Sequence, residues 1–418
     1  MLRNRRTFLA VVAALAILLG SSLLLPRRGQ GRLRAAAPRA CPAPSPADRP
    51  GPPIALPTDG PTGMAGEFEP QSAILLGCNE LVRFHEAFFV DFVAATHESV
   101  RLIGLLSDGD DRRAAEELLG RAGLDADAIE LIELPVLTMW VRDYGPLFTR
   151  DADGKPAIVD ADTSTRGGQL DPADGDDSSP RLLAEMLGLR CINTPARIEG
   201  GNLLTNGRGL VVSTTTLAAE NLDPPAVTAL ESTLADDLGL RRWVYLRPLE
   251  GEPTGHVDMF VAFVAPNVAV VGQMDPDADA RNAAILDEAA ELLAREQTPL
   301  GPMEVHRVDM PAPAEGVWLT YTNVVFANGT LLVPSYTGVD ARIETRVREL
   351  YATLLPGWTI KPLACDSVIE LGGAMHCLTM NIPAFVHLPA GLAGRPAMLS
   401  PGARDLRPTR PRPVAAGR

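Results

Sequence analysis

Four short motifs in this sequence carry side chains that together could act on a cation. In chain order they are Trp140-Val141-Arg142-Asp143-Tyr144-Gly145-Pro146, Glu199-Gly200-Gly201-Asn202, Gly255-His256-Val257-Asp258 and Gly372-Gly373-Ala374-Met375-His376-Cys377. Glycines in these motifs let the backbone turn tightly and approach another group closely, next to a polar side chain. Long stretches separate the motifs, so only the fold can bring them together. Their combination favours an enzyme with a cysteine nucleophile.

The chemistry that these residue types allow is hydrolysis of a guanidino group. Asp143 and Asp258 could hold a planar guanidinium by charge-assisted hydrogen bonds. Cys377, as a thiolate, could attack the central carbon, while His256 protonates the leaving nitrogen and then activates water. Glu199 could orient His256, as the third member of a triad does. The expected products are a ureido group and ammonia, and no cofactor is needed.

Each motif also has an ordinary structural interpretation. Cys377 is equally consistent with a small buried apolar side chain, the commonest fate of a free cysteine. Asp143 could pair with Arg142 at the surface, and Glu199 could cap a turn. His256 and Asp258 are two residues apart in a stretch with strand character, which places their side chains on the same face.

The four motifs, in this order, resemble the Porphyromonas-type peptidylarginine deiminase and agmatine deiminase family of the guanidino-modifying superfamily. The likeness runs from about Gly63 to Pro389 and includes the opening Gly66-Glu67-Phe68-Glu69-Pro70. It implies a five-bladed α/β propeller, the pentein fold. Carried over by position, the resemblance implies that Cys377 is the nucleophile and His256 the acid/base. It implies further that Asp143 and Asp258 bind the guanidinium and that Glu199 is the partner of the histidine.

The resemblance and the motifs also nominate residues that contact the substrate. Trp140 could pack on the guanidinium face, and Asn323 stands in the family's Tyr-x-Asn segment. Arg142 and Asn202 are further candidates within their motifs. Arg166 could bind a substrate carboxylate, as in the peptidylarginine branch, or could be a solvated loop residue.

Two departures from the family pattern bear on the substrate more than on the reaction. Agmatine deiminases usually carry Asn-Ala-Trp-Gly-Gly where this chain reads Asp162-Thr163-Ser164-Thr165-Arg166-Gly167-Gly168, and Ala374 replaces a glycine. Neither change touches the residues that would perform the chemistry. The substrate is therefore left open among peptidyl-arginine, arginine and agmatine, the last of which would connect the protein with putrescine biosynthesis.

Composition agrees with a globular protein that binds a cation. The 418 residues are 46% hydrophobic and 22% charged, with a net charge of -14. Because residues 1–40 carry eight Arg and residues 392–418 carry six Arg against Asp405, the part between them is near -27, which disfavours nucleic acid. The five cysteines form no C-x-x-C pair, and His256 and Asp258 have no further ligand nearby, so neither disulfides nor a metal are expected.

The two ends of the chain are expected to lie outside the catalytic domain. Residues 1–37 combine Arg5-Arg6 with an apolar run from Phe8 to Leu25, the pattern of a bacterial export signal or a membrane anchor. Residues 38–62 are rich in proline and indicate a disordered linker, and 391–418 a disordered tail. We therefore expect a protein that is periplasmic, extracellular or tethered, and touches the membrane only through its N-terminal segment.

Between these ends, residues 63–390 form the expected catalytic domain, with about five passes of strands and one helix. Expected helices are 81–96, 111–122, 180–187, 225–238, 277–295 and 339–354. Expected strands include 72–76, 100–106, 129–137, 157–160, 202–204, 209–214, 243–246, 257–265, 268–272, 304–308, 320–327, 331–334, 358–362, 365–369 and 375–380. This rhythm predicts repeated α/β units whose strand ends converge on one site.

Two other functions fit the same motifs. An amidinotransferase would use the same covalent intermediate with an amine acceptor in place of water. A catalytically inactive, tethered module could bind cationic peptides. The complete set of Cys377, His256, Asp143 and Asp258 argues against the inactive module. The sequence does not reveal the oligomeric state.

Overall fold

The computed structural model describes residues 63–151, 153–163, 175–221, 231–232 and 234–392. The predicted export segment, linker, most of the tail, Arg166 and part of the expected helix 225–238 lie outside these residues. No helix in the described part of the chain is long and apolar enough to cross a membrane.

Five sheets of three or four strands share one plan in the described residues: a central strand pairs antiparallel with one neighbour and parallel with the other. In the first, β1 (Gln71–Gly77) lies between β18 (Thr379–Pro383) and β2 (Leu102–Leu106), and β3 (Glu130–Glu133) follows β2. The others are β4 (Leu147–Arg150), β5 (Pro156–Asp162) and β6 (Arg190–Arg197); β7 (Leu204–Thr205), β8 (Leu210–Thr214) and β9 (Arg242–Leu246); β10 (Val261–Ala265), β11 (Val268–Gln273) and β14 (Glu304–Asp309); and β15 (Val325–Ala327), β16 (Thr330–Ser335) and β17 (Thr359–Ala364). A small hairpin pairs β12 (Gln297–Thr298) with β13 (Gly301–Pro302).

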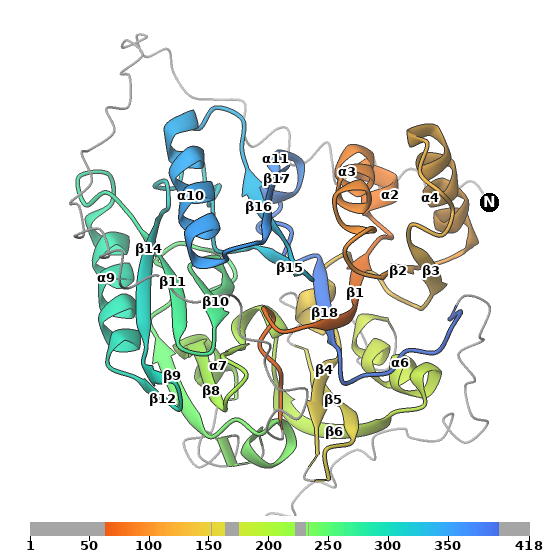
Figure 1. Cartoon of the computed structure of the whole chain (residues 1–418), viewed down its shortest axis with the longest axis horizontal. Coiled ribbons are helices and arrows are strands. Elements are labelled where there is room, and N and C mark those ends of the chain that lie inside the picture. The colour runs from red at the N-terminus through yellow and green to blue at the C-terminus, as the bar shows by residue number, and fades with distance from the viewer. Residues whose placement is uncertain (1–62, 152, 164–174, 222–230, 233, 393–418) are drawn as a thin grey trace, which may run out of the picture. The chain divides into compact units, whose positions relative to one another are not determined.

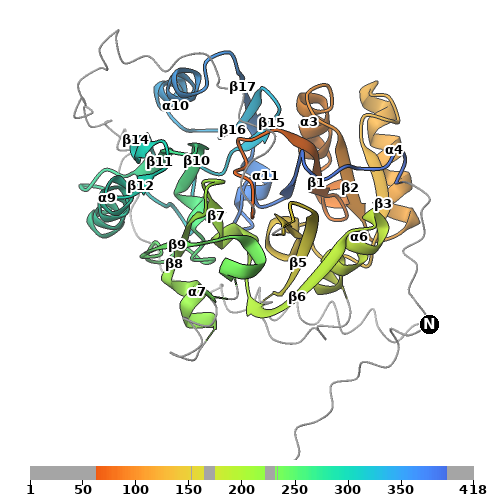
Figure 2. The same cartoon turned by 60° about the horizontal axis from the view of Figure 1, so that its bottom comes forward.

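Helices connect the parallel strands, because a parallel pair needs a long crossover. Helix α3 (Glu86–Thr96) lies between β1 and β2, α6 (Ser179–Leu187) between β5 and β6, α9 (Ala280–Ala294) between β11 and β14, and α10 (Ala341–Leu354) between β16 and β17. Figure 1 shows α9 alongside β11 and β14, and Figure 2 shows β1, β2 and β3 side by side. The remaining helices are α2 (Leu81–Phe84), α4 (Gly109–Ala122), α5 (Val141–Tyr144), α7 (Thr215–Glu220) and α11 (Asp366–Ile369), with 3₁₀ turns η2 (Asp176–Ser178), η3 (Gly200–Asn202) and η4 (Val257–Met259).

Local sequence explains where the longer helices begin. Asp108, Asp279 and Asp340 precede α4, α9 and α10, and each side chain accepts from the backbone of the first turn: two N–H groups for Asp108 and Asp279 and one for Asp340. Helix α4 ends at Gly123, which has a φ of 72°. The inner face of α9 is apolar, and its buried Leu286 and Leu293 each contribute roughly 2 kcal/mol by leaving water.

The predicted rhythm is present as five similar sheets, while several predicted elements are wrong in detail. The helix expected at 81–96 is divided at His85 into α2 and α3. Residues 365–369, expected as a strand, contain α11, because Val368 and Ile369 donate to the Cys365 carbonyl. The strand expected at 320–327 is reduced to β15, and that expected at 375–380 begins only at Thr379.

The expected strand 257–265 is also wrong at its start, where it matters for the site. Residues Val257–Met259 form η4, closed by the Phe260 N–H donating to the Val257 carbonyl, and β10 begins at Val261. The argument that strand alternation places His256 and Asp258 on one face therefore fails. A 3₁₀ turn brings the two side chains to the same region instead.

Candidate active site

The His256 segment is fixed by buried polar groups on both sides of it. The Glu252 carboxylate accepts hydrogen bonds from the backbone of Thr254 at 3.0 Å and of Gly255 at 2.5 Å. Gly255 has a φ of +67°, which other residues rarely adopt. The Asn202 side-chain oxygen accepts from the backbone N–H groups of Val257 at 3.2 Å and Thr214 at 2.9 Å. The Asn202 side chain therefore supports the backbone of the His256 segment, whereas the sequence analysis predicted that it contacts the substrate.

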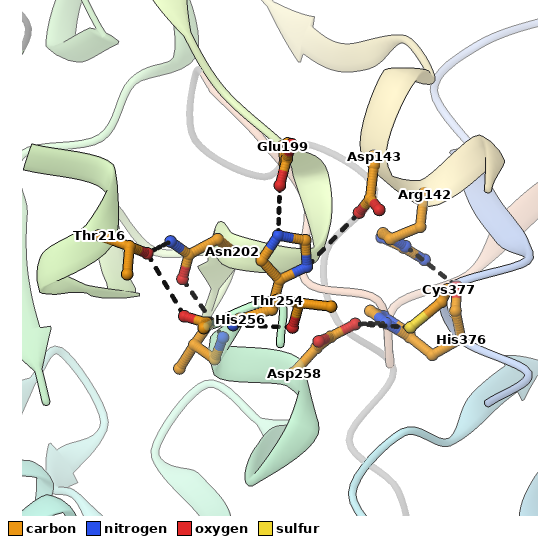
Figure 3. A network of polar contacts seen from close by, with 12 residues as sticks. Arg142, Asp143, Glu199, Asn202, Thr216, Thr254, His256, Asp258, His376 and Cys377 are labelled. Atoms are coloured by element: carbon orange, nitrogen blue, oxygen red, sulfur yellow. Dashed lines mark hydrogen bonds and ion pairs between the residues drawn. The ribbon is translucent and has the colours of Figure 1, made fainter. Parts of the chain in front are cut away.

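The buried His256 ring lies between two carboxylates (Figure 3). Its Nε2 is 2.5 Å from Glu199 Oε2, and its Nδ1 is 3.6 Å from Asp143 Oδ1. Burial lowers the pKa of His256, but Asp143, Glu199 and Asp258 outweigh it and raise this pKa to about 10. The ring is therefore an imidazolium at neutral pH. Burial and the neighbouring Glu199 and Asp258 raise the pKa of Asp143 to about 7.

Cys377 lies in the turn between α11 and β18 and is 5% exposed. Its Sγ is 3.3 Å from Asn323 Nδ2 and 3.6 Å from Asp258 Oδ2. Gly373 leaves room beside the sulfur, since a Cβ there would lie 2.9 Å from Sγ and 2.7 Å from Cζ3 of Trp140. The Trp140 ring therefore borders the same small space. Burial, together with Asp258 and Asp143, raises the pKa of the Cys377 thiol.

Two buried carboxylate oxygens at the site have no hydrogen-bond partner among the described residues: Asp143 Oδ1 and Asp258 Oδ1. A Cβ built on Gly201 would lie 2.6 Å from His256 Nδ1, 2.9 Å from Asp143 Oδ1 and 3.3 Å from Asp258 Oδ2. These three atoms thus surround one point above Gly201. Because an unpartnered buried carboxylate oxygen is unfavourable, this arrangement favours a cationic hydrogen-bond donor.

Two residues that the sequence analysis gave no role stand behind Asp258. His376 Nδ1 is 2.8 Å from Asp258 Oδ2, and His376 Nε2 is 2.8 Å from Glu67 Oε2. Glu67 also accepts a hydrogen bond from Arg142 at 2.5 Å. Glu67 and His376 stand in segments that the sequence analysis had singled out: Glu67 in the opening Gly66–Pro70 segment and His376 in the motif that ends at Cys377. Their pairing has no sequence signal, because 309 positions separate them.

Arg142 is buried among supporting residues, and the substrate contact predicted for it stays a prediction. The residue is 3% exposed, and its guanidinium donates to Glu67, to the Asn381 side chain at 2.9 Å and to the His376 carbonyl at 3.3 Å. With those bonds made, Arg142 is part of the supporting structure. The structure brings together the other predicted residues that it describes, which are Cys377, His256, Asp143, Asp258, Glu199, Trp140 and Asn323.

The described residues contain no cluster of three or more His, Cys, Asp or Glu side chains arranged to hold a metal ion. The groups that converge here are a thiol, an imidazolium, carboxylates and an indole. Such a set can bind a planar cation and perform nucleophilic and acid/base chemistry on it.

Comparisons with known proteins place the chain in a family. A family model described as Porphyromonas-type peptidyl-arginine deiminase matches residues 63–383. The agmatine deiminase of Pseudomonas savastanoi pv. phaseolicola is 26% identical over 306 residues, covering 65% of this chain and 81% of that protein. Among solved structures, the agmatine deiminase of Enterococcus faecalis matches with a TM-score of 0.65 at 22% identity, covering 77% of this chain and 96% of that one. The agmatine deiminase of C. jejuni matches with a TM-score of 0.62 at 19% identity, covering 79% and 98%. These structural matches establish a mixed α/β fold.

Proposed function

Because the chain belongs to the Porphyromonas-type peptidyl-arginine deiminase family, hydrolases of C–N amidine bonds, we propose that it converts a guanidino group to a ureido group through a covalent Cys377 intermediate. The observation that carries the proposal is a pair of buried carboxylates, Asp143 and Asp258, each with one oxygen that accepts no hydrogen bond among the described residues, while the other oxygen of Asp258 lies 3.6 Å from the Cys377 sulfur. A guanidinium has N–H donors in a fixed planar fork, which suits two carboxylates.

Charge balance supports a cationic substrate. Four carboxylates, Glu67, Asp143, Glu199 and Asp258, face three cations in the buried network, which are Arg142, His256 and His376. One negative charge is left over when all are ionised, and one guanidinium neutralises it. The same cation favours loss of the Cys377 proton to solvent, because it offsets the carboxylates that raise the pKa of the thiol.

The chemical steps then follow from the groups present. The Cys377 thiolate adds to the guanidinium carbon and forms a C–S bond. The His256 imidazolium gives its proton to one nitrogen, the C–N bond breaks, and ammonia leaves a thiouronium on the sulfur. His256, now neutral, takes a proton from water as the water oxygen adds to the same carbon. The C–S bond breaks and the remaining O–H proton passes to solvent, where ammonia takes it up; this releases the ureido product and the thiolate, while Glu199 holds the His256 ring throughout.

The test is a colorimetric ureido assay on the full chain with agmatine, free arginine and an arginine-containing peptide. Cys377→Ala is expected to abolish turnover, while Cys191→Ser, which changes an exposed cysteine, should leave it intact. Ammonia should appear in equal amount to the ureido product, and the preferred substrate identifies the branch of the family. Ureido product from none of the three substrates, or undiminished turnover by Cys377→Ala, would refute the proposal. Amidino transfer to an added amine without ureido product would replace it.

We further propose that the five similar sheets are the blades of a propeller and that residues 1–37 direct export. The matching strand order of the five sheets supports the first proposal, and the basic then apolar sequence supports the second. A crystal structure in which the five sheets do not surround a common axis would exclude the propeller. Fractionation of expressing bacteria tests export: a full chain found only in the cytoplasm would exclude it.

A further inference from the structure

The site contains two bridges of the same chemical type, one behind each predicted guanidinium ligand. In the first, His256 joins Asp143 to Glu199. In the second, His376 joins Asp258 to Glu67. The proposed chemistry uses the first bridge, whereas the second has no assigned role. The side chain of His376 is 4% exposed, and burying a polar ring is unfavourable unless it makes hydrogen bonds.

The two contacts of the His376 ring fix its hydrogen-bonding pattern. Both ring nitrogens lie 2.8 Å from a carboxylate oxygen, and an ionised carboxylate can only accept. A neutral imidazole has one N–H, so it could satisfy only one of the two ionised carboxylates. Two donors are available in the imidazolium. Glu67 is itself held by Arg142, which keeps its carboxylate ionised and, together with His376, overcomes burial to lower the pKa of Glu67 to about 2.

The consequence lies at Asp258. Its Oδ2 is engaged by His376 Nδ1 at 2.8 Å and by Asn323 Nδ2 at 3.1 Å, which fixes the plane of the carboxylate. Its Oδ1 keeps no partner among the described residues. The backbone N–H of His376 donates to Asn323 Oδ1 at 2.9 Å, so Asn323 also anchors the segment that carries Cys377.

We propose that Glu67 and His376 are positioning residues: His376 Nδ1 holds the Asp258 carboxylate beside Cys377 and the point above Gly201, where the substrate cation would bind, and Glu67 holds the ring. Arg142 anchors the far end of this bridge through its ion pair with Glu67. The inference rests on the proposed function for its substrate, but the grip on a planar cation can be measured without turnover.

The test compares two substitutions that each keep half of the bridge. The side-chain N–H₂ of His376→Asn can take the place of Nδ1 and keep the bond to Asp258. That of His376→Gln reaches the place of Nε2 and keeps the bond to Glu67. Both variants lose the same positive charge and both stay polar. A positioning role predicts that they differ, whereas a merely structural role predicts that they do not.

The measurement is the rate of Cys377 alkylation by two reagents, cationic 2-chloroacetamidine and neutral iodoacetamide. The ratio of the two rates reports how well the carboxylates hold a planar amidinium, whether or not any guanidino substrate is turned over. We expect this ratio to fall at least tenfold in His376→Gln and no more than about threefold in His376→Asn. The iodoacetamide rate should change less than threefold in both, and Cys377→Ala should not be alkylated at this position.

The outcomes distinguish this inference from the proposed function. An equal ratio in both variants, or an equal loss of both rates, would overturn the positioning role. Absence of ureido product in the wild-type chain, with the amidinium preference intact, would instead defeat the proposed function alone. If either variant fails to fold, ¹⁵N-histidine NMR of the full wild-type chain decides. Two ring N–H signals that shift in Glu67→Gln support the bridge, and a single ring N–H overturns it.

Discussion

Adding one methyl group at Gly201 should inactivate the protein without unfolding it. The Cβ of an alanine there would lie 2.6 Å from His256 Nδ1 and 2.9 Å from Asp143 Oδ1, at the point where the site converges. Ordinary contacts lie near 3.5 Å or more, so the ring or the carboxylate must move by about 1 Å. A displacement of that size in a catalytic group lowers the rate roughly 100-fold, or about 2.7 kcal/mol in activation free energy.

The measurement is kcat/KM in the ureido assay, with the free energy of unfolding determined in urea. We expect Gly201→Ala to lose about 100-fold in kcat/KM and roughly 1–3 kcal/mol in stability. Gly120→Ala, in the exposed face of α4, is the matched control, because nothing lies within 4 Å of its added Cβ. Its activity should equal that of the wild-type chain. Full activity of Gly201→Ala would show that this point is not where the substrate binds.

Three other results are expected. First, kcat/KM should rise with pH as Asp143 ionises near pH 7 and fall as His256 loses its proton near pH 10, and a flat profile from pH 6 to 8 would contradict the assignment of Asp143. Second, Glu67 has its pKa depressed from 4.5 to about 2, so its stabilisation is present above pH 4.5 and is lost as the pH falls toward 2. The free energy of unfolding, measured in urea, should therefore fall by roughly 3 kcal/mol less between pH 4.5 and pH 2 in Glu67→Gln than in the wild type. An equal fall in both would be evidence against the ion pairs of Glu67. Third, Cys191 is an exposed cysteine and Cys377 is the proposed nucleophile, so Cys191→Ser should be inactivated by iodoacetamide as fast as the wild type, and protection by this substitution would contradict the assignment of Cys377.

The sequence was informative where a motif is local and where a pattern repeats. The glycine-rich motifs located Cys377, His256, Asp143 and Asp258, and the structure brings all four together. The recurring strands and helices indicated five similar α/β units, which appear as five sheets with one strand order. Both kinds of signal depend on neighbours in sequence, which is why they could be recognised without a structure.

The errors arose where contacts between distant residues decide the outcome. Asn202 holds the Val257 N–H across 55 positions and helps to fold a 3₁₀ turn where the apolar pattern predicted a strand. The hydrogen bonds of Arg142 to Glu67 and Asn381 were not foreseen, because these partners lie 75 and 239 positions away. No periodicity in the sequence records such pairings.

Because β18 pairs with β1, the first sheet and the site beside it can be completed only late in synthesis of the chain. Strand β18 is the last strand of the described chain and β1 is the first, and contacts such as Ser72 with Val386 span 314 positions. Cys377, the proposed nucleophile, lies just before β18, so a growing polypeptide lacks this residue until almost the whole domain has been synthesised. If the proposed mechanism holds, a nascent fragment that ends before residue 377 has no deiminase activity. Any deletion that removes β18 should likewise deprive β1 of its edge partner and leave that strand open to pairing with other chains.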